Sequence, residues 1–584
     1  AQDLRRHLDG EPVLARAQSL GYRAQKFLRR NALAIGTGAA VTTLLLVALA
    51  FVSWQAQRAI REAARAQAMQ DFVVALFENT DQAGSGVGLD VRTLLDAGVR
   101  RADTELLGQP QARAELLGLV VKLRQGLGDD RQALDLLDRQ SQVLASLEGE
   151  APARIGIESA ALRGRSLRAL GQPEVCVRAL VPWMPVSEQQ AANQPRAVSE
   201  FLSQLGRCHR ALGGRDVARD LFGQALALRR APGESKALQA ESLADLAGLL
   251  ADEGRYAEAI TATRAALGLL RQSGGDRNAL GVEIWRELGG LYRSVGDALE
   301  SEASYRQALE IALTRFGPGH PATTAVQRPL GAILLQAGEL EEAQRLLQAA
   351  HDRLLARFGP EHPDVAASWQ QLGRLAWEQG RLALAREAFE RSLQLRRRSN
   401  ELGARGGVVC DLAMVRLAID GTDSAELLAH ECQQLALGSD PELAARAEML
   451  LADVALRRDN PDAALALLAS ARQRLLAAGL APDALALEPV NLARARIAVD
   501  HGDATTAATL VQALQAQPRE PGPESQAWAW RSKALEARRL CLSGAVSQGR
   551  ELRARALAQA GAEQPERQRL LDDIAALGSP CGVP

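Results

Sequence analysis

Aromatic residues are scarce in this chain of 584 residues, at 3% of the composition, whereas alanine and leucine are abundant. Alanine and leucine favour helices and aromatic residues favour strands, so the composition predicts an all-α fold. No charge of one sign dominates, because the net charge is −1, and no overall field draws the chain to nucleic acid. The six cysteines are too few for the scaffold of a disulfide-rich domain.

Catalytic and metal-binding patterns are missing as well. No serine, histidine and aspartate, and no cysteine and histidine, share a spacing that would assemble a nucleophile. His320 and His362 hold equivalent places one repeat apart, too far from each other to meet at one metal ion within ~2–2.5 Å, and we interpret them as loop-structuring residues. Asp129 and Asp130 stand where a helix begins and are interpreted as capping residues. The sequence predicts no catalytic residue, no metal site and no cofactor.

An uncharged run, Ala32–Trp54, is the feature around which the chain is organised. Its 23 residues would reach ~34 Å as a helix at ~1.5 Å per residue, enough for a hydrocarbon core of ~30 Å. A buried helix of a soluble protein is the alternative, but such a helix rarely stays uncharged for so long. Because 31 residues precede the run, it does not resemble a cleaved signal peptide. We predict a single transmembrane helix over residues 32–54.

The charges on the two sides of this run predict its orientation. Residues 12–31 carry five positive charges and no acid, whereas the three arginines of residues 58–65 are partly offset by Glu62. By the positive-inside rule, residues 1–31 form a basic cytoplasmic segment beside the inner membrane. The remainder of the chain is then expected in the periplasm of a two-membrane bacterium.

Small residues line one face of the predicted span. Ala32, Gly36 and Ala40 lie four residues apart, which allows two backbones to approach closely, so a homodimer through this face is expected. After the span the helical pattern continues without glycine or proline until a glycine-rich run at residues 82–88. Residues 55–88 are therefore predicted to be a membrane-proximal helix and a hinge.

The segment before the span, DLRRHLDGEPVLARAQSLGYRAQKFLRRN at residues 3–31, carries a family resemblance. It resembles the segment that joins the kinase domain to the membrane helix in bacterial transmembrane serine/threonine protein kinases with C-terminal tetratricopeptide repeats. The chain itself has no glycine-rich loop after a strand and no HRD or DFG motif, so these residues cannot transfer phosphate. The resemblance implies that a kinase domain lies upstream of Ala1, and enzyme status is left open.

From Pro110 onward, glycines recur at intervals of 39 to 43 residues between apolar-periodic runs, with one double step where Asn460 takes the turn. They are Gly128, Gly171, Gly213, Gly254, Gly296, Gly338, Gly380, Gly421, Gly502 and Gly544. A second series marks the boundaries: Pro110, Pro152, Pro195, Pro321, Pro363, Pro441, Pro482 and Pro523. Proline suits the first turn of a helix and glycine the residue after its end. We predict about eleven units of helix A, glycine turn and helix B within residues 89–562, and a capping helix over Glu563–Leu577 before the tail of 563–584.

The spacing inside the units identifies their type. Residues of one unit at the intervals W-x2-L-G-x2-Y are Trp285, Leu288, Gly289 and Tyr292, followed by Gly296, Tyr305 and Ala308. Another unit repeats the pattern with Trp369, Leu372, Gly373, Gly380, Ala385 and Phe389. This pattern is similar to the tetratricopeptide repeat. The period of about 42 and the RFGPGHP and RFGPEHPDVA segments resemble the kinesin-light-chain class of these repeats.

The resemblance implies a solenoid whose A helices line a concave groove that binds protein or peptide partners. Projecting that face gives a row of groove residues: Arg207, Arg210, Arg286, Arg293, Arg328, Arg374 and Trp377. Arginine forks bind carboxylates, so the row favours an acidic peptide or a C-terminal carboxylate. The alternative is that Glu200, Glu283, Glu287 and Glu378 neutralise these arginines as surface pairs.

The cysteines are expected to pair in an oxidising compartment. Cys410 and Cys432 lie about 11 residues on either side of one turn, so antiparallel helices place them level. The repeat map also brings together Cys176 with Cys208, and Cys541 with Cys581. The alternative is six reduced, buried thiols.

Two functions remain open. The first is the extracytoplasmic sensor half of a receptor-type serine/threonine kinase, which transmits partner binding across the membrane. The second is a membrane-anchored scaffold, without any kinase, that recruits envelope proteins.

Overall fold

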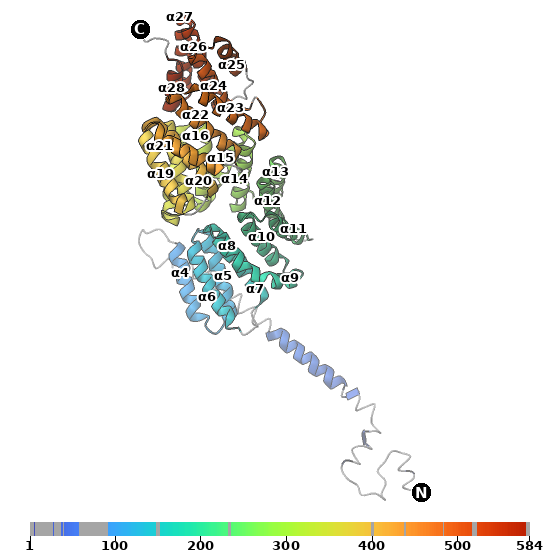
Figure 1. Cartoon of the computed structure of the whole chain (residues 1–584). Coiled ribbons are helices and arrows are strands. Elements are labelled where there is room, and N and C mark those ends of the chain that lie inside the picture. The colour runs from blue at the N-terminus through green and yellow to red at the C-terminus, as the bar shows by residue number, and fades with distance from the viewer. Residues whose placement is uncertain are drawn as a thin grey trace. The chain divides into compact units, whose positions relative to one another are not determined.

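The computed structural model describes residues 5, 21, 27–28, 37–38, 40–57, 91–147, 152–231, 235–398, 402–436, 440–482, 484–516 and 522–579. Within these ranges the secondary structure is helical and contains no strand, as the composition predicts (Figure 1). The chain forms two compact units, one of residues 1–124 with 132–156 and one of residues 125–131 with 157–584.

Antiparallel helix pairs make up almost all of the described chain after α4 (Val91–Glu105) (Figure 1). The eleven pairs are α5 (Pro110–Gly126) with α6 (Asp130–Ala145), α7 (Ala153–Ala169) with α8 (Pro173–Leu180), α10 (Pro195–Ala211) with α11 (Arg215–Arg229), α12 (Lys236–Asp252) with α13 (Tyr256–Gln272), α14 (Ala279–Ser294) with α15 (Ala298–Phe316), α16 (Pro321–Ala337) with α17 (Leu340–Phe358), α18 (Pro363–Glu378) with α19 (Leu382–Arg398), α20 (Leu402–Ile419) with α21 (Thr422–Ala436), α22 (Pro441–Arg457) with α23 (Pro461–Ala477), α24 (Glu488–Asp500) with α25 (Ala504–Ala516), and α26 (Pro523–Leu542) with α27 (Val546–Glu563). A short helix, α9 (Met184–Gln190), lies between the second and third pairs, and α28 (Gln568–Leu577) follows the last.

The turn inside each pair has a left-handed residue. All ten of the glycines predicted at turns have positive φ, for example 76° at Gly254. The exception is the turn before α23, where Asp459 has φ 57° and Asn460, one residue later, caps the helix by accepting from the N–H of Ala463 at 3.1 Å. Glycine adopts this conformation without steric cost, so the glycine series sets where each helix A ends.

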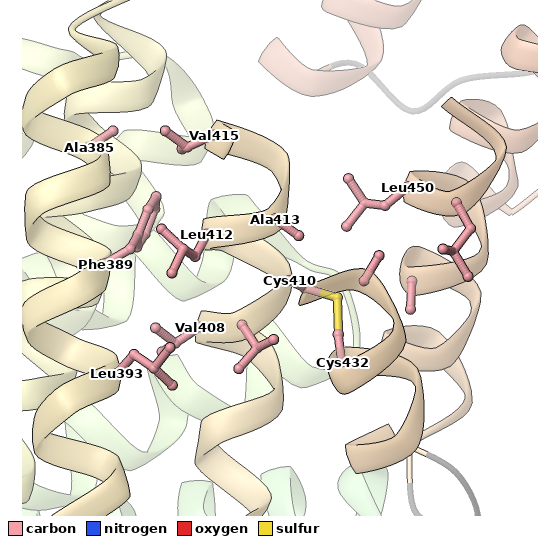
Figure 2. Packing of buried hydrophobic residues seen from close by; sticks show 14 of the residues in the cluster. Ala385, Phe389, Leu393, Val408, Cys410, Leu412, Ala413, Val415, Cys432 and Leu450 are labelled. Carbon is pink, nitrogen blue, oxygen red and sulfur yellow. A yellow bond between two sulfur atoms is a disulfide. The ribbon is translucent and has the colours of Figure 1, made fainter. Parts of the chain in front are cut away.

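A glycine in several of the A helices lets helix B approach closely. A Cβ added at Gly289 would lie 2.9 Å from the ring of Tyr305, and one at Gly373 would lie 2.6 Å from Phe389. Phe389 is fully buried and packs with Val408, Leu412 and other residues of the core shown in Figure 2. The aromatics of the repeat pattern, Tyr305 and Phe389, therefore fill the space between the two helices of their pairs.

Among the described residues, the structure contains two buried disulfides, each between two neighbouring helices. Cys410 on α20 is bonded to Cys432 on α21, with the two Cα atoms 5.5 Å apart (Figure 2). Cys176 on α8 is bonded to Cys208 on α10, with a Cα separation of 6.2 Å. These are two of the pairings that the repeat map predicts. The third, Cys541 with Cys581, remains a prediction because Cys581 lies outside the described residues.

Some boundaries differ from the sequence predictions. The terminal helix begins at Gln568 instead of Glu563, because α27 continues through Glu563. Helix α8 has only 8 residues and α9 is extra, since Pro182 and Pro185 interrupt the second helix B of the predicted series.

The apolar run is helical over the part that the structure describes. Residues Ala40–Gln57 are long and apolar enough to cross a membrane by length and composition, and none of this window is buried within the structure. Leu44 is 73% exposed, so the apolar side chains of this helix are not covered by the residues that the structure describes. Ala40 belongs to this helix, whereas Ala32 and Gly36 of the predicted dimer face lie outside the described residues, as do most of residues 1–31 and 58–88.

Candidate protein-interaction surface

The A helices of the second unit form its inner surface. Each helix A from α10 to α22 touches the next helix A, whereas contacts between successive B helices are weaker. Elements that approach one another more closely line the inside of a curved stack. The residues predicted for the groove all lie on these A helices, as expected, and the structure shows which of them remain available.

Four of the six predicted groove arginines bind a carboxylate on the next helix A. The pairs are Arg207 with Asp245, Arg210 with Asp252, Arg328 with Asp364, and Arg374 with Asp411. In each pair the acid follows the arginine by 36 to 42 residues, close to one repeat. The charge of these arginines is therefore neutralised along the stack.

The Arg207 pair is the most enclosed on α10. Its Nε and Nη2 atoms donate to the two carboxylate oxygens of Asp245 at 2.6 and 3.1 Å, and Nη2 also donates to Glu241 at 2.6 Å. Burial alone would lower the pKa of Arg207, but Asp245 and Glu241 hold it well above its usual value. Arg207 is thus a fixed cation that joins α10 to α12.

Asp411 forms a similar junction between α18, α20 and α22. Its carboxylate is 1% exposed and accepts from Gln370 Nε2 at 2.8 Å, Arg374 Nε at 3.1 Å and Arg446 Nη2 at 2.5 Å. Burial alone would raise the pKa of Asp411, but Arg446 and Arg374 hold it below its usual value. Arg374, predicted as a ligand-binding residue of the groove, therefore belongs to a structural junction between three A helices.

Arg286 and Arg293 on α14 are different. Both are exposed, and neither has a hydrogen-bond or ion-pair partner among the residues that the structure describes. Together with Arg328 they lie within electrostatic range of the Tyr305 hydroxyl, whose pKa is raised by burial against the opposing effect of the three arginines. The available positive charge of the predicted row is therefore concentrated at the fifth pair.

The four glutamates that the sequence offers as alternative partners of these arginines have different environments. Glu200 pairs with Arg229 on its own repeat, at 3.1 Å, and Glu378 pairs with Arg567 at 2.9 Å. Burial raises the pKa of Glu287 to about 7, although Arg210 and Arg286 act in the opposite direction. Glu283 is exposed. The four paired arginines are instead neutralised by aspartates on the next helix A. In the sequence, these aspartates could have been found as acids that follow each of the four arginines by about one repeat.

Trp377, the predicted aromatic of the groove, is in contact with the C-terminal end of the chain. The guanidinium carbon of Arg569 lies 4.6 Å from the centre of the Trp377 ring. Helices α18 and α28 are far apart in the sequence and meet only in the folded array, so no sequence pattern indicates this contact.

The two histidines structure loops, as predicted. The Nδ1 atom of His320 accepts from the N–H of Ala322, and that of His362 from the N–H of Asp364, both at 3.1 Å. Each ring also stacks on the preceding phenylalanine, at 4.6 and 4.1 Å between centroids. Asp130 begins α6 and forms an ion pair with Arg357 at 2.7 Å, and burial raises its pKa.

Comparison with known proteins identifies the repeats. The family model described as "Tetratricopeptide repeat" matches residues 198–276, 282–356 and 322–398. No curated protein matches the chain in sequence.

Three solved structures resemble parts of this chain. BtubC (BKLC) from P. vanneervenii is 19% identical, covers 39% of this chain and 92% of its own, and has a TM-score of 0.34. A Rap protein complexed with competence and sporulation factor is 13% identical, with coverages of 62% and 97% and a TM-score of 0.47. A putative kinesin light chain of Podosopora anserina is 20% identical, with coverages of 35% and 99% and a TM-score of 0.29.

Because all three TM-scores are below 0.5, the assignment depends on the family match and on the observed helix pairs. Residues 198–276 and 282–398 are tetratricopeptide repeats, and this part of the chain is a protein–protein interaction module of that type.

Proposed function

We propose that the inner surface of the repeats binds an acidic peptide segment of a partner protein, with Arg286 and Arg293 on α14 as the binding cations. The observation that carries this proposal is that these two predicted groove arginines, unlike the other four, have no carboxylate partner among the described residues. An unpaired guanidinium on a concave protein-binding surface is a strong site for a bidentate carboxylate.

The two arginines flank a notch in the helix surface. Arg286, Gly290 and Arg293 are four and then three residues apart, so they lie on one face of α14. A Cβ added at Gly290 would have only one atom within 4 Å, the hydroxyl oxygen of Tyr305 at 3.4 Å. The floor of the notch is therefore bare backbone beside a hydroxyl donor, and its two sides are cationic.

The preceding repeat shows how such a notch is filled. Gly248 is 42 residues before Gly290 and holds the same place on α12. A Cβ there would collide with the guanidinium of Arg210 and would lie 2.8 Å from the Glu287 carboxylate. The chain's own charged side chains thus occupy the notch of α12. At Gly290 a carboxylate from a partner would take the corresponding place.

Binding of a fluorescein-labelled polyglutamate peptide to the full chain, measured by anisotropy, tests the proposal. Arg286→Glu with Arg293→Glu should abolish binding. Gly290→Leu should weaken binding because the leucine side chain fills the notch, and it should leave α14 intact because leucine favours helices. The matched control is Arg230→Glu with Arg345→Glu, which makes the same charge change at exposed positions at the end of α11 and on α17. Equal binding by the groove variant and the control would refute the assignment.

We further propose that the chain is anchored in a membrane, with residues 1–31 cytoplasmic and the repeats periplasmic. The exposed apolar helix at residues 40–57 and the basic flank before it support this proposal. A reporter fusion after Ala83 that is active only in the cytoplasm would refute the orientation. Gly36→Leu should reduce self-association in a membrane two-hybrid assay, and an unchanged signal would exclude this face as the dimer contact.

The finer role is the sensor half of a receptor-type serine/threonine kinase, which the resemblance of residues 3–31 supports. The scaffold without a kinase is the second candidate. VAIK, HRD and DFG motifs encoded upstream of Ala1 would support the kinase. A reading frame without these motifs would exclude the kinase and favour the scaffold.

A further inference from the structure

The connection between α27 and α28 packs against two turns that lie far earlier in the chain. Residues 564–569 contact the turns that follow α16 and α18, and α16 and α18 themselves touch α26 and α28. All of these residues belong to the second compact unit. The C-terminal end of the array therefore returns to its sixth and seventh pairs.

Three polar contacts make this junction. Arg567 is 5% exposed, and its Nε donates to Glu378 Oε2 at 2.9 Å. The backbone N–H of Glu341, in the first turn of α17, donates to Glu566 Oε2 at 2.8 Å. The guanidinium of Arg569 lies over the ring of Trp377 at 4.6 Å.

Consecutive pairs are joined by apolar clusters as well as by ion pairs, whereas the side-chain contacts described for this junction are polar. The apolar residues of α28, Leu570 and Ile574, are buried against α26 and α27 and do not face the sixth and seventh pairs. Helix α28 is thus held by its own end of the array, while Glu566, Arg567 and Arg569 face the earlier turns. A contact made of charge and a cation–π interaction is replaceable by another segment that offers the same groups.

The earlier turns are shaped to receive these groups. The Glu378 carboxylate accepts an arginine, the Trp377 ring receives a second arginine, and the N-terminus of α17 receives a carboxylate. Close approach also depends on Gly338, where an added Cβ would lie 2.9 Å from Arg567 Cδ. Within the chain, the surface therefore receives an acid, the arginine that follows it and a second arginine two residues later, as in Glu566–Arg569.

We propose that the surface formed by Trp377, Glu378 and the start of α17 is a second partner-binding site, specific for a Glu-Arg-x-Arg segment, and that residues 566–569 fill it within the chain. A partner that carries such a segment binds by displacing the chain's own. This site takes a cationic pair and lies on other residues than the acid-binding notch at Gly290, so it stands independently of the proposed function.

The test uses a labelled peptide with the sequence EQPERQRLLD of residues 563–572 and the full chain. Arg567→Ala with Arg569→Ala vacates the site and should bind the peptide at least tenfold more tightly than the natural chain, by fluorescence anisotropy. Adding Trp377→Ala and Glu378→Gln to that variant should remove binding. A peptide with both arginines replaced by glutamine is the matched control and should not bind.

Helical content and thermal midpoint are measured for each variant by circular dichroism. If the double variant is misfolded, Arg569→Gln alone serves, because Arg569 is partly exposed, and a smaller increase in peptide affinity is then expected. Failure of the peptide to bind a folded vacated chain would overturn the proposal. Equal binding after Trp377→Ala with Glu378→Gln would overturn it as well.

Discussion

Arg374 on α18 donates to Asp411 on α20 at 3.1 Å, and this pair represents how the A helices of the array are joined. An arginine on one helix A meets an aspartate on the next at four places along the second unit. The inner surface is thus an ordered sequence of ion pairs, interrupted at α14. Such pairs contribute to stability according to their burial.

Removing a buried acid from this series should cost far more than removing an exposed one. Asp411→Ala leaves the arginines that face it, Arg374 and Arg446, without their shared carboxylate, and we expect a loss of about 3 kcal/mol. Asp364→Asn is the control, because Asp364 is 43% exposed in its pair with Arg328, and should cost below about 1 kcal/mol. Hydrogen exchange of α18 to α22 measures both. Equal losses would show that burial does not determine the strength of the pair.

Replacing a glycine by alanine should lower the stability of the fold at a turn and raise it inside a helix. Gly254 has φ 76°, and an added Cβ would meet nothing within 4 Å, so Gly254→Ala costs about 1 kcal/mol through backbone strain alone. Gly223, within α11, is equally unobstructed but has no positive φ, and Gly223→Ala should stabilise by about 0.5–1 kcal/mol. Denaturation midpoints should move in opposite directions, and a shift of the same sign would contradict the role given to the turn glycine.

The sequence predicts the architecture well because its signals are local. A positive φ at Gly254 or Gly296 needs only glycine, and a close approach at Gly373 needs only a small residue. The interactions between repeats are less visible, because Arg374 and Asp411 are 37 residues apart and neither reveals its partner in a single-helix projection. The contact between Arg569 and Trp377 depends on the curvature of the whole unit, which no local pattern carries.

The disulfides should contribute measurably to stability. Cys410 and Cys432 close a separation of 22 residues, and replacing both by alanine should cost about 3 kcal/mol. Treatment with a reductant should lower the thermal midpoint of the natural chain. The thermal midpoint of the double variant should fall by less, because that variant has one disulfide fewer to lose. Non-reducing peptide mapping of protein from the cell envelope should recover Cys176 with Cys208, Cys410 with Cys432, and Cys541 with Cys581. Six free thiols would refute both the pairing in the cell and the periplasmic location.

The stability of the fourth and fifth pairs should depend on pH through Glu287. Burial raises its folded pKa to about 7, above the value of 4.5 for an unperturbed glutamate. A raised carboxyl pKa means that its contribution to stability is fully present below pH 4.5 and is lost as the pH rises through about 7. Glu287→Gln should therefore unfold like the natural chain at pH 4 and be more stable at pH 8, by up to roughly 3 kcal/mol. Denaturant titrations at both pH values measure this, and equal stability at pH 8 would contradict the raised pKa.

The same carboxyl should control the affinity of the proposed notch. Arg286 precedes Glu287 on α14 and acts on its charge, so ionised Glu287 attracts the guanidinium that an acidic peptide needs. As the pH falls from 8 to 6, Glu287 is protonated, and the labelled polyglutamate peptide, whose own carboxylates remain ionised, should bind several-fold more tightly. Glu287→Gln should show the tighter binding at both pH values. Exposed Glu283, one turn earlier, provides the control, because Glu283→Gln should raise affinity by a similar factor at both pH values and preserve the pH dependence. A pH dependence that survives Glu287→Gln would place the titrating group elsewhere.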